Sequence, residues 1–292
     1  TPVTDGERVY AWFGSAGLHA VDFDGEPVWS ADLGPVATLG MGVGTSPVLH
    51  DGLVILQIDR ELGEGSELVG VHADSGEVAW RTPRPVQSSW TTPTLMQFEG
   101  RTELITTGNE LLLSYDPATG RELWRMEGLA SNAIHRPLPA GELVIHTAGY
   151  PTKVVKAVRL GGEGDLTGTD HLAWSYAKGT AYVASNLVYD GIVYLVADNG
   201  VMTALDAETG ELIYEGGRPP VPQRYVSSPV AWDGKILLAG EDGEVLVIRA
   251  GPEYEVLSVN SMGEKIWAVP SIAADRVYLR GLEPLWAIGS AP

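Results

Sequence analysis

The stretch SYDPATGRELWRM, residues 114–126, is a hairpin signal that ends in a large aromatic residue. Asp116 can accept hydrogen bonds from backbone N–H groups two residues on, and Pro117 fixes the φ angle that suits the second position of a turn. Gly120 can adopt the left-handed conformation that closes a hairpin with a bulge. Close variants of this stretch are AVDFDGEPVWSA (20–31), GVHADSGEVAWRT (70–82) and ALDAETGELIYEG (204–216). The recurrence indicates a repeated supersecondary unit.

Ahead of each hairpin the sequence has a short strand, a turn often of the Asp-Gly type, and a more apolar strand. This pair occurs seven times, in repeats that start near residues 1, 45, 91, 135, 184, 227 and 268. Each repeat therefore reads as four short strands, and a repeat of about 40–50 residues with four strands is typical of a propeller blade. We predict an all-β fold, a β-propeller of about seven four-stranded blades in a single domain, residues 1–292.

Two repeats depart from the pattern, and two others carry insertions. In the sixth repeat the turn is AGPEY and Leu257 takes the place of the aromatic residue. The seventh stops after LWAIGS (285–290), so we expect the last blade to lack its outer strand. The insertions DRELGEGSE (59–67) and GGEGDLTGTDH (161–171) read as loops. The first residue is Thr1 rather than Met, so we expect a processed product with any targeting segment missing.

The aromatic residue after each hairpin has a structural explanation. One blade cannot cover both of its own faces, so a large ring between neighbouring blades would bury both sheets. Burial of such a ring contributes about 2–3 kcal/mol. We therefore predict a blade-docking role for these rings, which are Trp29, Trp80, Trp124, Trp174 and Tyr214.

Composition excludes several classes of function. The formal charge is −19, which argues against nucleic-acid binding because that needs grouped Lys and Arg side chains. The chain has no cysteine, so disulfides, thiolate chemistry and Cys-ligated metal centres cannot form. No stretch approaches the 18 apolar residues of a membrane span. The six histidines are scattered singly, and we predict no metal site.

The pattern A-x-D-x-x-T-G-x-x-x-W is met by YDPATGRELW and, with Tyr for Trp, by LDAETGELIY. It resembles the tryptophan-docking repeat of the PQQ-like β-propellers, the quinoprotein alcohol dehydrogenase type. The whole chain looks like bacterial PQQ-like repeat proteins related in fold to the propeller lipoproteins of the outer-membrane β-barrel assembly machine. The resemblance implies a periplasmic or otherwise extracytoplasmic location. It also leaves open a parent protein with eight blades.

The resemblance implies two different functions. Quinoprotein dehydrogenases of this type hold PQQ in a central funnel with a stacking Trp, a calcium ion bound by Glu and Asn, a catalytic Asp and often a vicinal disulfide. The disulfide is impossible without cysteine, and the other elements match no motif in this chain. We therefore predict a non-catalytic scaffold that binds a protein or a ligand and uses no cofactor. The alternative is a PQQ-dependent dehydrogenase with a degenerate site.

Binding residues are predicted on the segments just ahead of each first strand, which should surround the mouth of the central channel. Convergent aromatic and Arg side chains there suit an anionic or cyclic ligand, or a peptide loop. Alternatively, the rings pack the channel wall and the arginines neutralise an acidic surface. We expect a monomer with a protein partner or small ligand at this mouth, and no transmembrane segment. The predicted residues are Trp90, His135, Arg136, Tyr182, Arg224, Tyr225 and Trp267.

Overall fold

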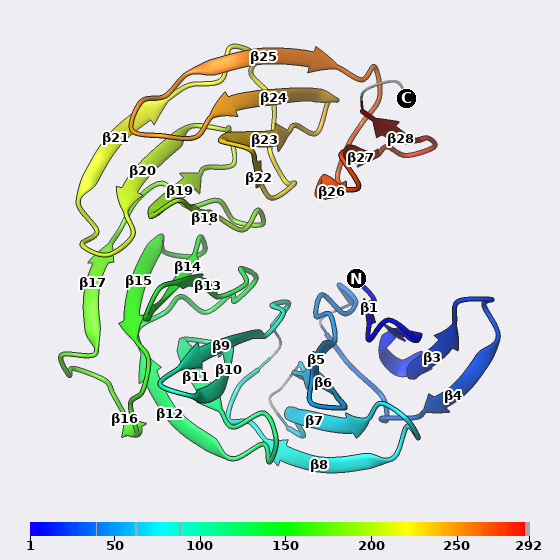
Figure 1. Cartoon of the computed structure of the whole chain (residues 1–292). Helices are drawn as coiled ribbons and strands as arrows, with labels where there is room; N and C mark the ends of the chain where they lie inside the picture. The colour runs from blue at the N-terminus through cyan, green and yellow to red at the C-terminus, as the bar shows by residue number, and fades with distance from the viewer. Residues whose placement is uncertain (39, 62–63, 88, 290–292) are drawn as a thin grey trace. The chain divides into compact units, whose positions relative to one another are not determined.

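The computed structural model describes residues 1–38, 40–61, 64–87 and 89–289. These residues form 28 β-strands and one short 3-10 helix, Gly14–Ala16. The strands make seven successive sheets, which we call blades 1–7 in chain order (Figure 1). Two compact units divide them: unit 1 is Thr1–His146 with Val158–Leu172, and unit 2 is Thr147–Ala157 with the chain from Ala173 onward. No helix in the described ranges is long and apolar enough to cross a membrane.

Unit 1 holds the first three blades. Blade 1 consists of β1 (Val3–Thr4), β2 (Arg8–Trp12), β3 (Leu18–Asp22) and β4 (Pro27–Ala31). Blade 2 consists of β5 (Val48–His50), β6 (Leu53–Ile58), β7 (Glu67–His72) and β8 (Val78–Pro83). Blade 3 consists of β9 (Thr94–Phe98), β10 (Arg101–Gly108), β11 (Leu111–Tyr115), β12 (Glu122–Glu127) and β16 (Gly164–Asp165).

Blade 4 is divided between the units, and unit 2 holds the last three blades. Blade 4 consists of β13 (Leu138–Ala140), β14 (Leu143–Ala148), β15 (Val154–Arg159) and β17 (Leu172–Tyr176). Blade 5 consists of β18 (Leu187–Tyr189), β19 (Ile192–Val196), β20 (Met202–Asp206) and β21 (Leu212–Gly217). Blade 6 consists of β22 (Val230–Trp232), β23 (Lys235–Ala239), β24 (Glu244–Arg249) and β25 (Val256–Ser261). Blade 7 consists of β26 (Ser271–Ala273), β27 (Arg276–Arg280) and β28 (Leu285–Ile288).

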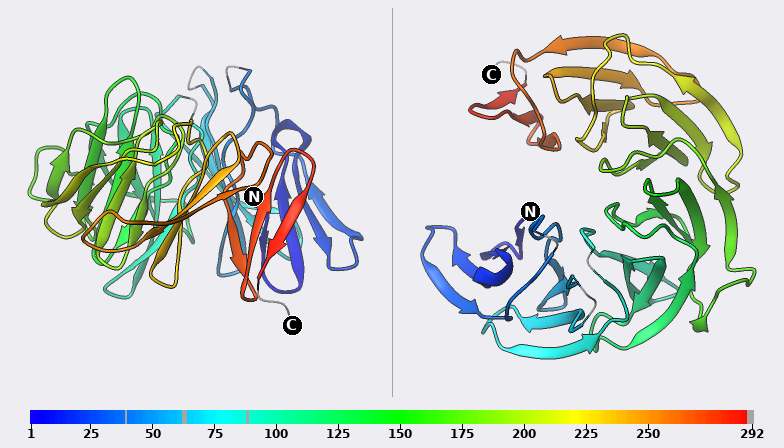
Figure 2. Two further views of the ribbon diagram at one scale, coloured as in Figure 1. Left: turned by 90° about the horizontal axis from the view of Figure 1, so that it is seen from above. Right: turned by 180° about the vertical axis from the view of Figure 1, so that it is seen from behind.

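Antiparallel order gives each blade two different ends. The turns between first and second strands and between third and fourth strands lie at one end, which we call the turn end. The connections between second and third strands lie at the other, the loop end, together with the links between blades. In the left panel of Figure 2 the links and loops of unit 1 point up and its hairpin turns point down. Each end of a blade therefore presents a different set of side chains.

The hairpin turns adopt the geometry that their sequence favours. In the Asp51-Gly52 turn both residues have positive φ, 43° and 76°, as type I′ hairpin turns require. In the blade 3 hairpin, Ala118 N–H donates to Asp116 Oδ1 at 2.9 Å, and Gly120 has φ of 71°. The register between β11 and β12 shifts by one residue beside this turn, as the predicted bulge requires. The turn chemistry thus sets the register of each blade.

Neighbouring blades within each unit pack face to face. Their first strands lie side by side, such as β1 with β5 and β18 with β22. Figure 1 shows the outer strands of the same blades splayed apart. The apolar cores lie between the sheets: one cluster joins blades 1 and 2, and others join blades 2 and 3, 5 and 6, and 6 and 7. Apolar burial between wedge-shaped neighbours therefore holds each unit together.

The outer-strand residues Trp29 and Trp174 rest on turn glycines of the following blade. A Cβ atom on Gly76 would lie 2.7 Å from the Trp29 ring, and one on Gly210 would lie 2.6 Å from the Trp174 ring. Each ring also donates its Nε1–H to a carbonyl of the same turn, Trp29 to Ala73 at 3.0 Å and Trp174 to Ala207 at 3.1 Å. Only glycine permits this close approach of the ring to the turn.

The insertion at residues 161–171 was predicted to be a loop, and that prediction is wrong in part. Gly164 and Asp165 form β16, which pairs in parallel with β12 opposite Trp124 and Arg125. The added strand satisfies backbone groups that an edge strand would leave unpaired. It also helps to bury Trp124 completely, and the indole Nε1–H donates to Glu103 Oε2 at 2.7 Å.

Blades 6 and 7 show how the irregular repeats are accommodated. Tyr254, from the AGPEY turn, packs against Tyr214 with ring centroids 6.1 Å apart. A Cβ atom on Gly217 would lie 2.5 Å from the Tyr254 ring, so here a tyrosine fills the space beside the preceding blade. Leu257 on β25 is 37% exposed. Blade 7 has three strands within the described residues, in agreement with the expected lack of an outer strand.

Candidate partner-binding surface

The seven side chains predicted at the channel mouth all lie on links between blades, at the loop end. Trp90, His135 and Arg136 belong to unit 1. Tyr182, Arg224, Tyr225 and Trp267 belong to unit 2.

In unit 1 the links before β9 and β13 run side by side. Trp90 N–H donates to Ala133 O at 2.9 Å, and the Thr91 hydroxyl donates to His135 O at 2.9 Å. The Trp90 indole donates to Gly42 O at 3.2 Å. Backbone hydrogen bonds thus fix the two links to each other and hold the Trp90 ring partly exposed.

His135 and Arg136 differ in accessibility. The His135 side chain is buried and lies near His146, a fully buried residue of β14 whose ring nitrogens find no hydrogen-bond partner among the described residues. Burial, with a contribution from the charge of His135, lowers the pKa of His146 to about 3. Arg136 is exposed, and its Nε donates to Thr94 Oγ1 at 2.9 Å. Of His135, His146 and Arg136, only Arg136 is exposed and therefore accessible to a partner.

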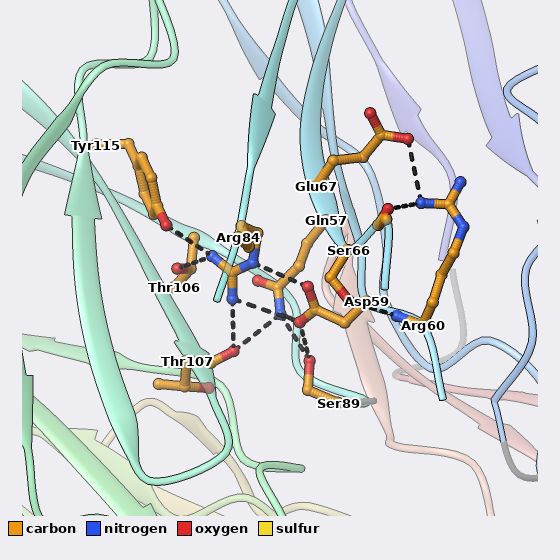
Figure 3. A network of polar contacts seen from close by, with 11 residues as sticks. Gln57, Asp59, Arg60, Ser66, Glu67, Arg84, Ser89, Thr106, Thr107 and Tyr115 are labelled. Carbon is orange, nitrogen blue, oxygen red and sulfur yellow. Dashed lines mark hydrogen bonds and ion pairs between the residues drawn. The ribbon is translucent and has the colours of Figure 1, made fainter. Parts of the chain in front are cut away.

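A buried ion pair anchors the link that carries Trp90 (Figure 3). Arg84 Nε donates to Asp59 Oδ1 at 2.8 Å, and both side chains are fully buried. Asp59 Oδ2 also accepts the Ser89 hydroxyl at 2.5 Å and Gln57 Nε2 at 2.7 Å. Burial alone would lower the pKa of Arg84, but the charge of Asp59 raises it overall. The network ties Ser89, next to Trp90, to the end of β6.

In unit 2 the loop after β19 joins two of the predicted residues. Tyr182 N–H donates to Asp198 Oδ1 at 2.9 Å, and Tyr225 N–H donates to Asp198 O at 2.9 Å. The Tyr225 ring is fully buried against Gly200. Tyr182 is exposed and meets the exposed Tyr150 edge to face, with ring centroids 5.3 Å apart. An aromatic pair therefore stands at the loop end of unit 2, while Tyr225 is part of the packing.

The segments that carry the remaining two predicted residues, Arg224 and Trp267, are both hydrogen-bonded to the loop after β23. Glu241 N–H donates to Arg224 O at 2.8 Å, and Ile266 N–H donates to Glu241 O at 3.2 Å. The Glu241 carboxylate lies 3.7 Å from Arg224 Nη1 and 3.7 Å from Lys265 Nζ. The Trp267 side chain is 53% exposed. The structure thus brings two cations and one large ring to the surface on a fixed backbone.

The charge is unevenly divided between the units. Unit 1 has 9 Lys and Arg against 23 Asp and Glu, a net charge of −14. Unit 2 has 10 against 15, a net charge of −5. Exposed aromatic and cationic side chains at the loop end of unit 2 have the composition of a protein-binding surface, where Trp, Tyr and Arg are enriched.

Two elements of a dehydrogenase-type quinone site are missing from the residues that the structure describes. The chain has no cysteine for a vicinal disulfide. In the part of the chain that the structure describes, no group of three or more His, Cys, Asp or Glu side chains is placed to hold a metal ion. Calcium takes six to eight oxygen ligands, usually with several carboxylates among them. We therefore derive no chemical step that involves a quinone or calcium.

A family model described as outer membrane protein assembly factor BamB matches residues 1–102, 64–159 and 108–283. The chain belongs to this BamB family. The alcohol dehydrogenase (quinone) dehydrogenase subunit of Acetobacter aceti is 32% identical over 101 residues, which are 32% of this chain and 12% of that relative. The chain thus spans only a small part of that enzyme's length.

Solved structures with the same fold include BamB from Moraxella catarrhalis, with a TM-score of 0.74, 16% identity and coverage of 97% of this chain and 82% of that chain. The C-terminal WD40 domain of Sif2 has a TM-score of 0.67 at 12% identity, with coverage of 99% and 79%. The predicted all-β propeller of seven blades is confirmed.

Sequence reasoning missed several residues of this surface. Tyr150, Glu241 and Lys265 contact or flank the predicted side chains but were not predicted. Glu241 belongs to the GEDG loop after β23, and Lys265 is two residues before Trp267. Glu241 could have been found by asking which charged residues of the loops face the links between blades, and Lys265 by including the neighbours of Trp267 on its own link.

Proposed function

We propose that this chain is a non-catalytic protein-binding module that works outside the cytoplasm. The family description, an outer membrane protein assembly factor, supports both the scaffold role and the location. One observation carries the proposal: exposed aromatic and cationic side chains at the loop end of unit 2 stand on links that hydrogen bonds tie from blade to blade. The partner class that follows is a protein of the outer-membrane assembly apparatus.

Rigid presentation is what makes these side chains suited to binding. Ordering a flexible loop opposes association, so a loop that is already fixed binds with less loss of entropy. Tyr182 is held through Asp198, and Trp267 through the Ile266–Glu241 contact. Exposed Trp and Tyr rings contribute a large contact area with few rotatable bonds. We expect these rings to contribute most of the affinity.

Affinity capture from a bacterial envelope extract, followed by identification of the bound proteins, tests the proposal. Trp267→Ala should reduce capture of the specific partner about tenfold or more, as truncation of a central aromatic residue does. The matched control is Trp232→Ala, because Trp232 is 41% exposed but is the last residue of β22, at the turn end. The control should capture as much partner as the original chain.

Two outcomes would count against this function. Equal loss of capture in both Trp variants would mean that the loop end has no special role. Reduction of an artificial electron acceptor by the chain supplied with PQQ and calcium would instead support the dehydrogenase alternative, which the resemblance to the Acetobacter aceti subunit raises.

A further inference from the structure

We propose that Arg224, Lys265 and Trp267 bind an acidic segment of the partner protein, with a partner carboxylate at the two cations and an adjoining apolar side chain on the Trp267 ring. The inference rests on the proposed function of the loop end of unit 2 and specifies the chemistry of its partner. Three observations support it: neither cation donates a hydrogen bond to a described residue, backbone hydrogen bonds fix the segments that carry them, and an exposed apolar ring follows two residues after Lys265.

Arg224 and Lys265 have their hydrogen-bond donors available. Each lies 3.7 Å from a Glu241 oxygen, beyond the usual N–H···O range of about 2.7–3.2 Å, and neither side chain donates to any described residue. Their side chains are 73% and 50% exposed. Arg125, by contrast, binds Glu122 with two hydrogen bonds of 2.6 and 2.7 Å. Arg224 therefore keeps the bidentate donor fork that a carboxylate prefers.

Glu241 sets the position of the two cations without neutralising both of them. Its backbone N–H is bound to Arg224 O and its backbone O to Ile266 N–H, so the two links are fixed on either side of it. The Glu241 carboxylate lies within ion-pair distance of both cations, so among the described residues Arg224 and Lys265 share one counter-charge. A second carboxylate from a partner would complete the pairing.

Trp267 supplies the apolar half of the surface. Its ring is 53% exposed, and the exposed Val269 follows two residues later. A free inorganic anion would leave this ring in water, whereas a peptide segment can place an apolar side chain on it and a carboxylate at Arg224. The combination therefore fits an acidic segment that carries an aromatic or aliphatic residue.

Charge complementarity gives the segment one preferred place on the chain. With a net charge of −19, most of the surface repels an acidic segment. At physiological salt the Debye length is about 8 Å, so a segment docked at the cluster interacts mainly with the charges around Arg224 and Lys265, and the distant acidic surface is screened. Repulsion elsewhere then favours a single mode of binding.

Fluorescence anisotropy with a labelled twelve-residue peptide of Asp and Glu around one Phe tests the inference. We expect the acidic peptide to bind at least about tenfold more tightly than a twin with Asn and Gln in place of Asp and Glu. The double variant Arg224→Gln/Lys265→Gln should lose about tenfold or more in affinity for the acidic peptide. Lys235→Gln, which removes a turn-end cation, should change the affinity by less than about twofold.

Equal binding of the two peptides, or no binding of either, would overturn the inference. Binding of the chain to anionic phospholipid vesicles through Arg224 and Lys265, without peptide binding, would overturn it as well. If capture of the envelope partner depends on Trp267 but not on Arg224 and Lys265, the proposed function stands and the acidic segment is wrong. Circular dichroism of each variant verifies that the fold is retained.

Discussion

Arg84→Met removes the positive half of the buried ion pair in Figure 3 and keeps most of the length of the side chain. The variant loses the bonds from Arg84 to Asp59 Oδ1 at 2.8 Å, to Thr106 Oγ1 at 2.6 Å and to Thr107 O at 3.1 Å. The Asp59 carboxylate then stays fully buried without a counter-charge.

The expected cost follows from desolvation. Removing one partner of a buried pair typically costs about 3–5 kcal/mol, because the other charge remains out of water. A domain is stable by about 5–15 kcal/mol, so this loss is a large fraction of the total. The double variant Arg84→Met/Asp59→Asn leaves no buried charge, and Asn still accepts the Ser89 hydroxyl. We expect it to be about 2 kcal/mol more stable than Arg84→Met alone.

Urea denaturation at pH 7, followed by far-ultraviolet circular dichroism, measures these free energies of unfolding. Arg81→Met is the matched control, since Arg81 forms an ion pair with Glu67 at 2.8 Å but is 40% exposed. Exposed pairs contribute about 0–1 kcal/mol, so this control should unfold at nearly the original urea concentration. Comparing Arg84→Met with Arg81→Met separates the cost of leaving a buried charge unpaired from the cost of losing an Arg–carboxylate contact.

The desolvation reasoning would be refuted by either of two results. Arg84→Met could prove no more destabilising than Arg81→Met. Alternatively, the double variant could lose the full sum of the two single losses, which would mean that Asp59 and Arg84 are not coupled.

Three further predictions concern the packing of the blades and are measured by the same denaturation. Trp124→Ala should cost about 3–5 kcal/mol as a fully buried ring, and a cost below about 1 kcal/mol would show that the ring is not part of the core. Gly120→Ala should lower the free energy of unfolding clearly more than Gly234→Ala. Both glycines have positive φ, but only at Gly120 would the added Cβ lie 2.5 Å from the Trp80 ring. Equal losses in the two variants would exclude the ring contact. His146 should make the chain less stable as the pH falls below about 6.5, because His146 takes up a proton in the unfolded state while its pKa in the folded state is about 3. The resulting loss in the free energy of unfolding between pH 8 and pH 5 is about 2 kcal/mol. This loss should vanish in His146→Leu.

The fold was predictable because each repeat contains the short-range sequence signals of its own strands and turns. Each hairpin contains its own turn residues, such as Asp116 and Gly120, and the aromatic residue after the turn stands at a fixed spacing. Turn chemistry acts over a few residues, so one sequence is enough to read it. The turn glycines that contact the Trp29, Trp80 and Trp174 rings were also visible in the sequence, but their contact with the preceding blade was not. That contact joins residues such as Trp29 and Gly76 across two repeats.

The candidate surface was predictable only in part. Positions on the links between blades followed from the repeat, but exposure did not, since Tyr225 and His135 are buried while Trp267 and Arg224 are exposed. Burial depends on which neighbouring loop covers a side chain, and loops vary most between repeats. Short β16 was missed for the same reason, because a two-residue strand has no periodicity to detect.

Hydrogen exchange of the chain with and without its captured partner tests the binding account most directly. The account predicts slower exchange on binding in the loop-end segments of unit 2 around Tyr182, Arg224 and Trp267, and unchanged exchange in the turn at Asp233 and Gly234. Protection confined to the hairpin turns or the outer strands, with these links unaffected, would contradict it.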